Sequence, residues 1–368
     1  MLMNEPIREP KDPDTISSTG TIRCLRAVAV AVIAIGIVAA LVAPVSLPAR
    51  GVHIEIPEGS GSRAIGALLR ERGLIRSPWA FVTYATLVGK AATLKPGSYS
   101  FAGFATIPGI VRALIAGEQY PNERSITIPE GWDERDIADY FAAEGVVEKE
   151  AWWAVAGYPA ADYRSDAKKP KVPDRSREFS FLADKPAWVG LEGYLYPDTY
   201  RIWRDATPED ILRKMLKNFD ARITPDLRAA IALQKKTIFA VITLASLVEK
   251  ESGADAERPV IAGILWKRLA AGMPLQVDAS VNYATGKRGT PVAADLKTPS
   301  PFNTYAHPGL PLGPIANPGI ASIRATIFPH ASSYLYYLHA PDERIIYSRT
   351  LEEHQAARAQ YLAPASRK

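Results

Sequence analysis

The pattern of apolar and polar residues between Thr237 and Gly253 predicts a helix that ends at an acid. At about 100° per residue, one stripe of this helix collects the apolar residues Ala240, Val241, Leu244, Leu247 and Val248. Glu251 continues the stripe one turn further on, whereas Glu249 is rotated from it by about 200°. We therefore expect the two carboxyls to face different surroundings, and only that of Glu251 to be buried.

Glu251 is consequently the first candidate catalytic residue. A carboxyl at the end of an apolar stripe loses hydration, which raises its pKa and lets it keep a proton near neutral pH. Such a group can act as a general acid. Ser252 and Gly253 should end the helix and leave Glu251 where a cleft can open. The alternative is an ordinary solvated glutamate in a last helical turn.

A strand, turn and helix pattern occurs twice in the first half of the chain. Residues 53–75 align without gaps on residues 125–147, with six identical positions that include the Pro-Glu-Gly turn of each copy. Each copy predicts a short strand, that turn, and an amphipathic helix closed by a C-cap glycine. The alternative is chance recurrence of a common unit. With a strand within 94–101 and a helix over 107–118, the stretch resembles a small α+β glycan-binding module of the LysM type.

The rest of the chain mixes both periodicities, which indicates an α+β fold. Helices are expected over 208–222, 225–234, 257–271 and 351–362, and a strand pair over 334–340 and 344–350. Residues 272–330, rich in Pro, Gly and Asn, predict a long ordered loop system, and such loops usually carry function. Residues 163–177, rich in Lys, Arg, Asp and Pro, predict an exposed loop or linker.

Two of these stretches supply candidate substrate-binding residues. In the aromatic-rich stretch 190–202, Glu192 and Tyr196 suit sugars, because rings stack on C–H faces while carboxylates accept hydrogen bonds from hydroxyls. In the loop system, the polar residues that are candidates to line a cleft are Gln276, Asp278, Ser280, Asn303 and Tyr305. The alternatives are an aromatic strand packed in a core, and side chains that satisfy backbone groups within the loops.

An apolar run over 27–47, interrupted by Pro44, is long enough to cross a bilayer. Arg23 and Arg26 precede it, so the positive-inside bias places residues 1–26 in the cytoplasm and the rest of the chain outside. The alternative is a cleaved signal peptide, because small residues occur near the end of the run.

Composition narrows the function classes further. The chain has 368 residues, of which 47% are hydrophobic and 23% charged, so a sizeable core can form. A net charge of +5 fits an acidic or membrane-proximal partner, but no basic stripe with interleaved aromatics indicates nucleic acid. The single Cys24 excludes an intrachain disulfide, and the five histidines show no spacing typical of a metal centre.

Five motifs together resemble the signature of the endolytic murein transglycosylase (YceG-like) family. In chain order they are EGYLYPDTY, LASLVEKESG, QVDASVNYATG, TPSPFNTY and GLPLGPIANPG. The similarity spans Ile54 to Leu362, and the combination is specific where each motif alone is weak. The family consists of bacterial inner-membrane proteins with an extracytoplasmic LysM-like part and a catalytic domain that cleaves peptidoglycan glycan strands.

By this resemblance the family's essential acid, the second glutamate of VEKE, is Glu251. It would protonate the oxygen between N-acetylmuramic acid and N-acetylglucosamine, then accept the proton of the muramyl 6-hydroxyl as that oxygen closes on the anomeric carbon. The product would carry a 1,6-anhydro end. One acid suffices for this reaction, where ordinary glycosidases need two carboxylates. Loop acids such as Asp278 or Glu192 could still lie close. No cofactor and no metal are expected.

The implied organisation has five parts: a cytoplasmic tail over 1–26, a transmembrane helix over 27–47, a LysM-like module over 48–150, a linker over 151–189 and a catalytic transglycosylase domain over 190–368. The substrate would be nascent peptidoglycan strands on the periplasmic side of the inner membrane, with cell-wall synthases as partners. The alternative function is a non-catalytic, membrane-anchored peptidoglycan-binding scaffold. A peptidase is disfavoured, because neither a Ser/His/Asp order nor zinc spacing is visible.

Overall fold

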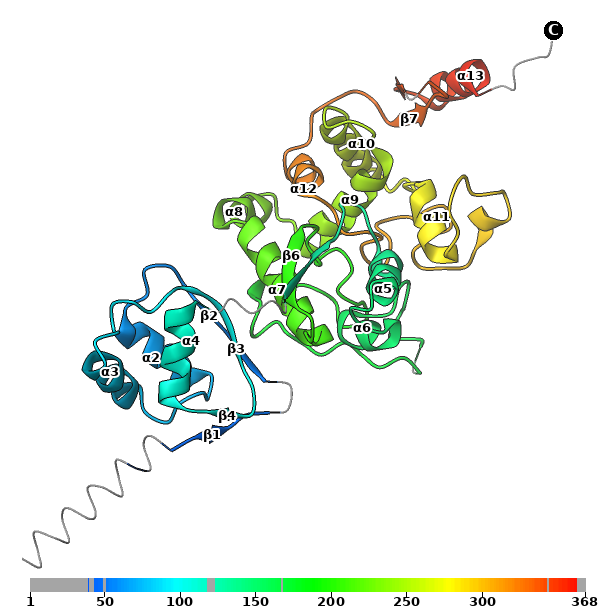
Figure 1. Cartoon of the computed structure of the whole chain (residues 1–368). Helices are drawn as coiled ribbons and strands as arrows, with labels where there is room; N and C mark the ends of the chain where they lie inside the picture. Colours follow the sequence, from blue (N-terminus) through cyan, green and yellow to red (C-terminus); the bar gives the residue numbers. More distant parts are fainter. Residues whose placement is uncertain are drawn as a thin grey trace, which may run out of the picture. The chain divides into compact units, whose positions relative to one another are not determined.

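The computed structural model describes residues 39, 43–48, 51–117, 123–166, 168–342 and 344–362. The chain divides into two compact units between Asn122 and Glu123. Both units contain helices and short antiparallel strand pairs, which confirms the expected mixed α+β class (Figure 1).

The smaller unit packs three helices against two strand pairs. Its helices are α2 (Ser62–Glu71), α3 (Pro78–Leu87) and α4 (Ile107–Ala116). Its antiparallel pairs are β1 (Val45–Ser46) with β4 (Phe104–Ala105), and β2 (Val52–Ile56) with β3 (Gly97–Phe101). Ile54, Leu69, Phe81, Tyr99 and Leu114 are buried in one core, so this unit has a hydrophobic centre of its own.

The larger unit is mainly helical. Its helices are α5 (Glu134–Ala143), α6 (Lys149–Ala156), α7 (Pro208–Arg222), α8 (Pro225–Leu233), α9 (Ile238–Glu251), α10 (Arg258–Ala270), α11 (Asp278–Thr285), α12 (Ile320–Ile327) and α13 (Leu351–Tyr361), with 3-10 turns η1 (Ser180–Leu182) and η2 (Asp295–Lys297). Its antiparallel pairs are β5 (Glu123–Thr127) with β6 (Thr199–Trp203), and β7 (Tyr336–His339) with β8 (Ile345–Ser348).

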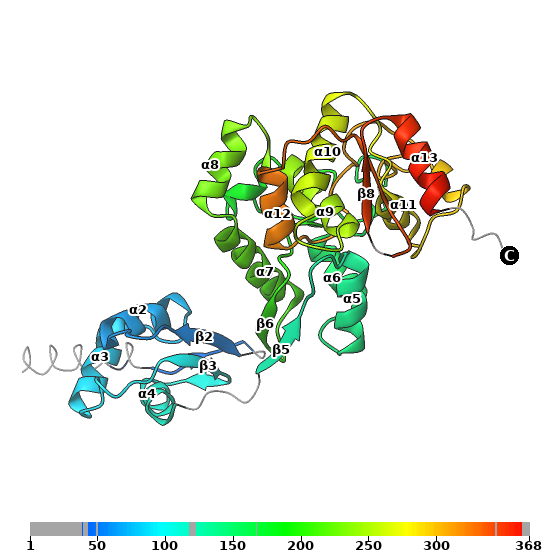
Figure 2. The same ribbon diagram turned by 90° about the horizontal axis from the view of Figure 1, so that it is seen from above.

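Helix α9 is the central helix of this unit (Figure 2). Thr237 caps it by accepting a hydrogen bond from the Ala240 N–H at 3.0 Å, and the Ser252 backbone is extended, so the helix ends at Glu251 as predicted. The prediction that only one side of this helix is buried is wrong. Every residue from Val241 to Val248 is buried, because α8, α10, α11 and α12 all contact this helix.

Both copies of the repeat form a strand, a turn and a helix, as predicted. Gly59 and Gly131 occupy the left-handed region in the two turns, with φ of 76° and 78°, a conformation that favours glycine. The copies belong to different units, however, because the second copy, residues 125–147, lies wholly within the unit that starts at Glu123. The predicted boundary at residue 150 is therefore wrong.

The predicted linker over 151–189 is also wrong. Trp152 and Phe181 are buried in the main core of the larger unit, and Arg175, 7% exposed, forms an ion pair with Glu209 at 2.6 Å. The basic composition of this segment suggested exposure, but its aromatic residues anchor it and a carboxylate neutralises its buried arginine.

The predicted loop system over 272–330 contains α11, η2 and α12. Asp278 is the first residue of α11, and the partial positive charge of a helix N-terminus favours an acidic side chain there. Gly286 ends the helix in the left-handed region, with a φ of 70°. The sequence pattern did not predict α11 and α12, because each has only eight residues and is surrounded by prolines and glycines. The irregular backbone is confined to the segments between these helices.

The predicted membrane helix lies almost wholly outside the described residues, of which it includes only 39 and 43–47. Its predicted end at residue 47 is wrong, because Val45 and Ser46 form β1 and pair with Ala105 and Phe104. Over the described ranges, no single helix combines the length and hydropathy of a bilayer span; α8 and α9 reach them only as a pair bent by 98°.

Candidate active site

Glu251 is partly buried at the C-terminal end of α9. The Tyr337 hydroxyl donates a hydrogen bond to its Oε2 at 3.0 Å, and His339 Nε2 lies 2.8 Å from its backbone carbonyl oxygen. Burial raises the pKa of the Glu251 carboxyl, and the charge of Asp278 adds to the rise. The Tyr337 hydroxyl, the His339 charge and the Ala279 N–H lower the pKa but do not cancel the effect of burial.

Asp278 and Tyr305 lie beside this acid. The Tyr305 hydroxyl donates a hydrogen bond to Asp278 Oδ1 at 2.6 Å, and the Asp278 carboxylate is close enough to act on the Glu251 pKa. Asp278 is exposed and Tyr305 is partly buried. The structure thus brings three of the predicted site residues together, and we call Glu251, Asp278, Tyr305, Tyr337 and His339 the Glu251 cluster.

The sequence did not identify Tyr337 and His339 as site residues. They are two positions apart on β7 and therefore point to the same side of that strand. Their rings meet edge to face with centroids 5.9 Å apart. The alternation of residues along the predicted strand indicates that Tyr337 and His339 share one side, but no sequence pattern indicates that this side contacts α9.

Gln276 lies on the segment that leads to Asp278. Its Oε1 accepts a hydrogen bond from Arg268 at 2.5 Å, and its backbone has a φ of 56°. Arg268 also donates to the Pro274 carbonyl oxygen at 2.7 Å. The buried Arg268 guanidinium thus holds the exposed Gln276 side chain, and with it the segment that leads to Asp278.

Ser280 and Asn303 are fully buried and organise the loops. The Ser280 hydroxyl donates to the Val277 carbonyl oxygen at 2.7 Å, and Asn303 Nδ2 donates to the carbonyl oxygens of Leu296 and Thr298 at 3.0 and 2.9 Å. These contacts match the loop-stabilising alternative.

Glu192 belongs to a different, buried network. Its carboxylate accepts hydrogen bonds from the Glu134 N–H at 2.9 Å, the Tyr283 hydroxyl at 3.1 Å and Asn317 Nδ2 at 2.9 Å. Burial raises its pKa well above the ordinary value, and the nearby Glu134 carboxyl adds to the rise. Tyr196 packs in the main core, with the Arg222 guanidinium 5.3 Å from its ring centre. The structure thus gives both residues internal roles.

The expectation that only one acid of the VEKE motif is buried is wrong, because the Glu249 side chain is buried as well. Its side chain is 6% exposed, forms an ion pair with Arg258 at 3.4 Å and accepts the Gly319 N–H at 3.0 Å. The two carboxyls do face different surroundings, as predicted. Glu249 has a guanidinium partner, whereas Glu251 has a tyrosine hydroxyl and a neighbouring carboxylate.

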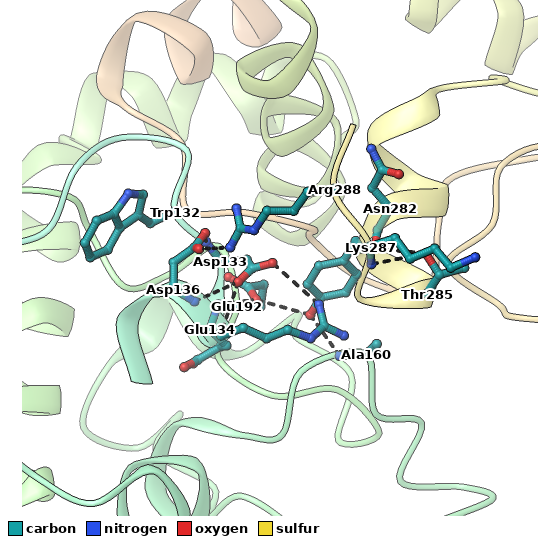
Figure 3. Close-up of polar contacts among 12 residues, drawn as sticks. Trp132, Asp133, Glu134, Asp136, Ala160, Glu192, Asn282, Thr285, Lys287 and Arg288 are labelled. Atoms are coloured by element: carbon teal, nitrogen blue, oxygen red, sulfur yellow. Dashed lines mark hydrogen bonds and ion pairs between the residues drawn. The ribbon is translucent and has the colours of Figure 1, made fainter. Parts of the chain in front are cut away.

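A pocket of about 210 Å³ lies near the Glu251 cluster, although none of the five cluster residues lines it; Figure 3 shows several of the lining residues. It includes Lys250 and Ala279, the residue before Glu251 and the residue whose N–H acts on its carboxyl. Its remaining lining residues come from α5, from α11 with the turn that follows it, and from Ile315: Asp133, Arg135, Asp136, Asn282, Tyr283, Gly286, Lys287, Arg288 and Gly289. Among the described residues, no group of three or more His, Cys, Asp or Glu side chains could hold a metal ion.

A partly buried acid with a raised pKa, set among tyrosines, is an arrangement suited to acid–base chemistry. The sequence comparisons identify the group more closely. The model of the YceG-like family matches residues 54–360. The chain therefore belongs to the YceG-like family.

Its relatives carry a common name. The chain is 33% identical over 320 residues to the endolytic murein transglycosylase of Bacillus subtilis (strain 168), covering 86% of each protein. It is 31% identical over 327 residues to that of Streptococcus pneumoniae serotype 2, covering 84% of this chain but 58% of the relative. A 2.6 Å crystal structure of a yceG-like protein from Listeria monocytogenes superimposes with a TM-score of 0.55 at 31% identity, covering 83% of this chain and 98% of that chain.

Proposed function

We propose that this protein is a lytic endotransglycosylase that cleaves the bond between N-acetylmuramic acid and N-acetylglucosamine within peptidoglycan strands and leaves 1,6-anhydro ends. The observation that carries the proposal is the Glu251 carboxyl, which is withdrawn from water and has a raised pKa. Family membership and the name of the relatives support the choice of substrate.

In this mechanism Glu251 acts twice. Burial shifts its pKa in the direction that favours the protonated carboxyl, and this form donates its proton to the bridging oxygen as the glycosidic bond breaks. The resulting carboxylate then accepts the proton of the muramyl 6-hydroxyl, whose oxygen bonds to the anomeric carbon. The Tyr337 hydroxyl and the Ala279 N–H stabilise the carboxylate formed between the two steps.

The closeness of Asp278 favours one second candidate, a hydrolase. In a hydrolase with two carboxyl groups, Glu251 would be the general acid and Asp278 the general base that activates a water molecule. Asp278 is exposed, accepts a hydrogen bond from Tyr305 and acts on the Glu251 pKa. The two reactions differ in their products, because hydrolysis leaves a reducing end that is heavier than the anhydro end by one water.

The test uses purified full-length protein in detergent with isolated glycan strands. The wild-type protein should generate anhydromuramyl ends, which mass spectrometry detects, and Glu251→Gln should abolish them while strand binding persists. Glu150→Gln, at an exposed glutamate outside the Glu251 cluster, is the matched control. A wild-type protein that binds strands and leaves them intact would be the non-catalytic scaffold instead.

We also propose where the enzyme works. The apolar residues 27–43 would anchor it in the inner membrane, with the larger unit on the periplasmic side; Arg23 and Arg26 support this orientation. The smaller unit would act as a LysM-like module that contacts or spaces the glycan. Cell-wall synthases are the proposed partners, because an enzyme that cuts nascent strands acts where they emerge.

A further inference from the structure

The pocket beside Glu251 is rich in cationic side chains. Four of its lining residues are cationic, namely Arg135, Lys250, Lys287 and Arg288, and two are anionic. Arg288 forms an ion pair with Asp136 (Figure 3), and Lys287 forms one with Asp295 at 2.5 Å. The lining therefore retains an excess of positive charge, which attracts an anionic ligand.

Arg135 is a cation of this pocket that combines unused hydrogen-bond donors with a fixed position over an aromatic ring. Among the described residues, its guanidinium contacts Asp133 at 3.5 Å and lies 5.0 Å from the centre of the Tyr283 ring. A guanidinium carries five N–H donors, so most of them stay free for a ligand. Its planar fork matches the two oxygens of a carboxylate.

The buried Glu192 network holds the Tyr283 ring, and thereby the guanidinium, in place. The Tyr283 hydroxyl donates to Glu192 at 3.1 Å and accepts the Ala160 N–H at 3.0 Å, so the phenol is held at its polar end. Arg135 lies over the face of this fixed ring. A guanidinium positioned in advance loses little conformational entropy when it binds a ligand.

We propose that this pocket is a carboxylate subsite with Arg135 as its main anion-binding residue, and that it receives the acidic substituent of the muramyl residue. The inference rests on the proposed function. The sugars of peptidoglycan are otherwise neutral, and their negative charge lies on the substituent at the muramyl 3-oxygen. Because Ala279 borders both the pocket and Glu251, the substituent would be bound next to the bond that is cut.

Two sources could supply the carboxylate: the stem peptide, or the lactyl group that is exposed when the stem is removed. The test compares intact strands, strands stripped of stems by an amidase, and strands whose stem carboxylates have been converted to amides. We expect wild-type kcat/KM to be about tenfold lower on the amidated strands through a higher KM, as expected for the loss of a charged hydrogen bond. Poorer cleavage of both amidated and stripped strands than of intact ones would assign the site to the stem. Better cleavage of stripped strands than of intact ones, in which the lactyl carboxyl is tied up as an amide, would assign it to the lactyl group.

Arg135→Gln should lose the distinction between intact and amidated strands, and Arg135→Lys should keep part of it because the charge remains but the fork is lost. Arg201→Gln, at an exposed arginine on β6 that pairs with Glu123, is the matched control and should keep the distinction. Equal cleavage of intact, amidated and stripped strands by the wild type, or an unchanged preference in Arg135→Gln, would overturn the subsite.

Binding separates failure of the subsite from failure of the proposed function. In the Glu251→Gln background, adding Arg135→Gln should weaken binding to intact strands about tenfold and leave binding to amidated strands unaltered. If wild-type protein yields no anhydro ends but Arg135 still governs binding, the function is wrong and the carboxylate subsite stands. If anhydro ends form but Arg135 has no effect on binding, only the subsite is wrong.

Discussion

The hydroxyl of Tyr337 on β7 donates a hydrogen bond to the Glu251 carboxyl at the end of α9, over 3.0 Å. The two residues are 86 positions apart in the chain, so the contact exists only in the folded protein. It lowers the pKa of a carboxyl that burial raises, and thus tunes the proton affinity of the proposed catalytic acid.

Tyr337→Phe should raise the Glu251 pKa further, because the hydrogen bond that favours the carboxylate is lost. A general acid works while it is protonated, so the alkaline limb of the pH–rate profile should move to higher pH. The maximal rate should fall roughly ten- to a hundredfold, since the carboxylate intermediate loses a charged hydrogen bond. The profile of anhydro-end formation against pH checks both effects, and an unmoved alkaline limb would contradict the role of Tyr337.

Asp278→Asn should move the same limb in the opposite direction. The Asp278 charge raises the Glu251 pKa, so its removal lowers the pKa and the rate falls at a lower pH than in the wild type. Asparagine keeps an oxygen for the Tyr305 hydroxyl, which preserves the local hydrogen bond. At low pH we expect less than about a tenfold loss of rate. A loss of several thousandfold at every pH would instead indicate that Asp278 activates water.

The buried Glu134 should make the stability of the larger unit depend on pH. Burial raises its pKa to about 8, so in the folded protein it holds its proton over a range where the unfolded chain has released it. Stability should therefore be complete below the ordinary glutamate pKa and fall as pH rises toward 8, by up to about 1.4 kcal/mol per pH unit.

Denaturant unfolding between pH 5 and pH 9 measures this dependence. Glu134→Gln should make the dependence less steep, because the amide keeps an oxygen for Trp152 Nε1, now at 2.8 Å from the carboxyl, but does not titrate. The dependence that remains would come from Glu192, whose pKa burial also raises. A variant with the same slope as the wild type would show that Glu134 is not the titrating group.

Gly319→Ala should destabilise the larger unit by about 1 kcal/mol or less. A Cβ at this position would meet the carboxyl end of the Glu130 side chain, and the Gly319 N–H that binds Glu249 is retained. Because Glu130 is exposed and its side chain is flexible, the carboxyl can move aside and α12 can keep its place, unlike in an overpacked core.

Gly253→Ala is the matched control, because its Cβ would meet its nearest atom at an ordinary 3.7 Å. Thermal unfolding should show a small drop for Gly319→Ala and a still smaller change for Gly253→Ala, and a large drop for Gly319→Ala would contradict the free movement of Glu130. Equal melting temperatures would mean that Glu130 moves aside without cost.

The local architecture was largely predictable from the sequence. The helix with Glu251 at its end, the two strand-turn-helix copies and the strand pair before α13 follow from periodicity and capping residues. The division between units was not predictable, since the second repeat copy and residues 151–189 join the larger unit through contacts distant in sequence. Short helices such as α11 were missed because prolines and glycines surround them.

The candidate site was predictable only in part. A helical stripe pointed to Glu251, and a loop-like composition to Asp278 and Tyr305, but the same reasoning also selected Ser280 and Asn303, which the structure uses inside the loops. Polar residues that line a cleft and polar residues that form hydrogen bonds with the loop backbone are of the same types. Only the tertiary structure distinguishes the two groups. Tyr337 contributes from a strand whose position against α9 no local pattern specifies.

The most direct test of Glu251 as the lone proton-transfer group is the cleavage of glycan strands in water enriched in heavy oxygen. The account predicts 1,6-anhydro ends that contain no heavy oxygen, because the muramyl 6-hydroxyl closes the ring, and no such ends from Glu251→Gln. Reducing ends that carry the heavy isotope, or anhydro ends that persist in Glu251→Gln, would contradict it.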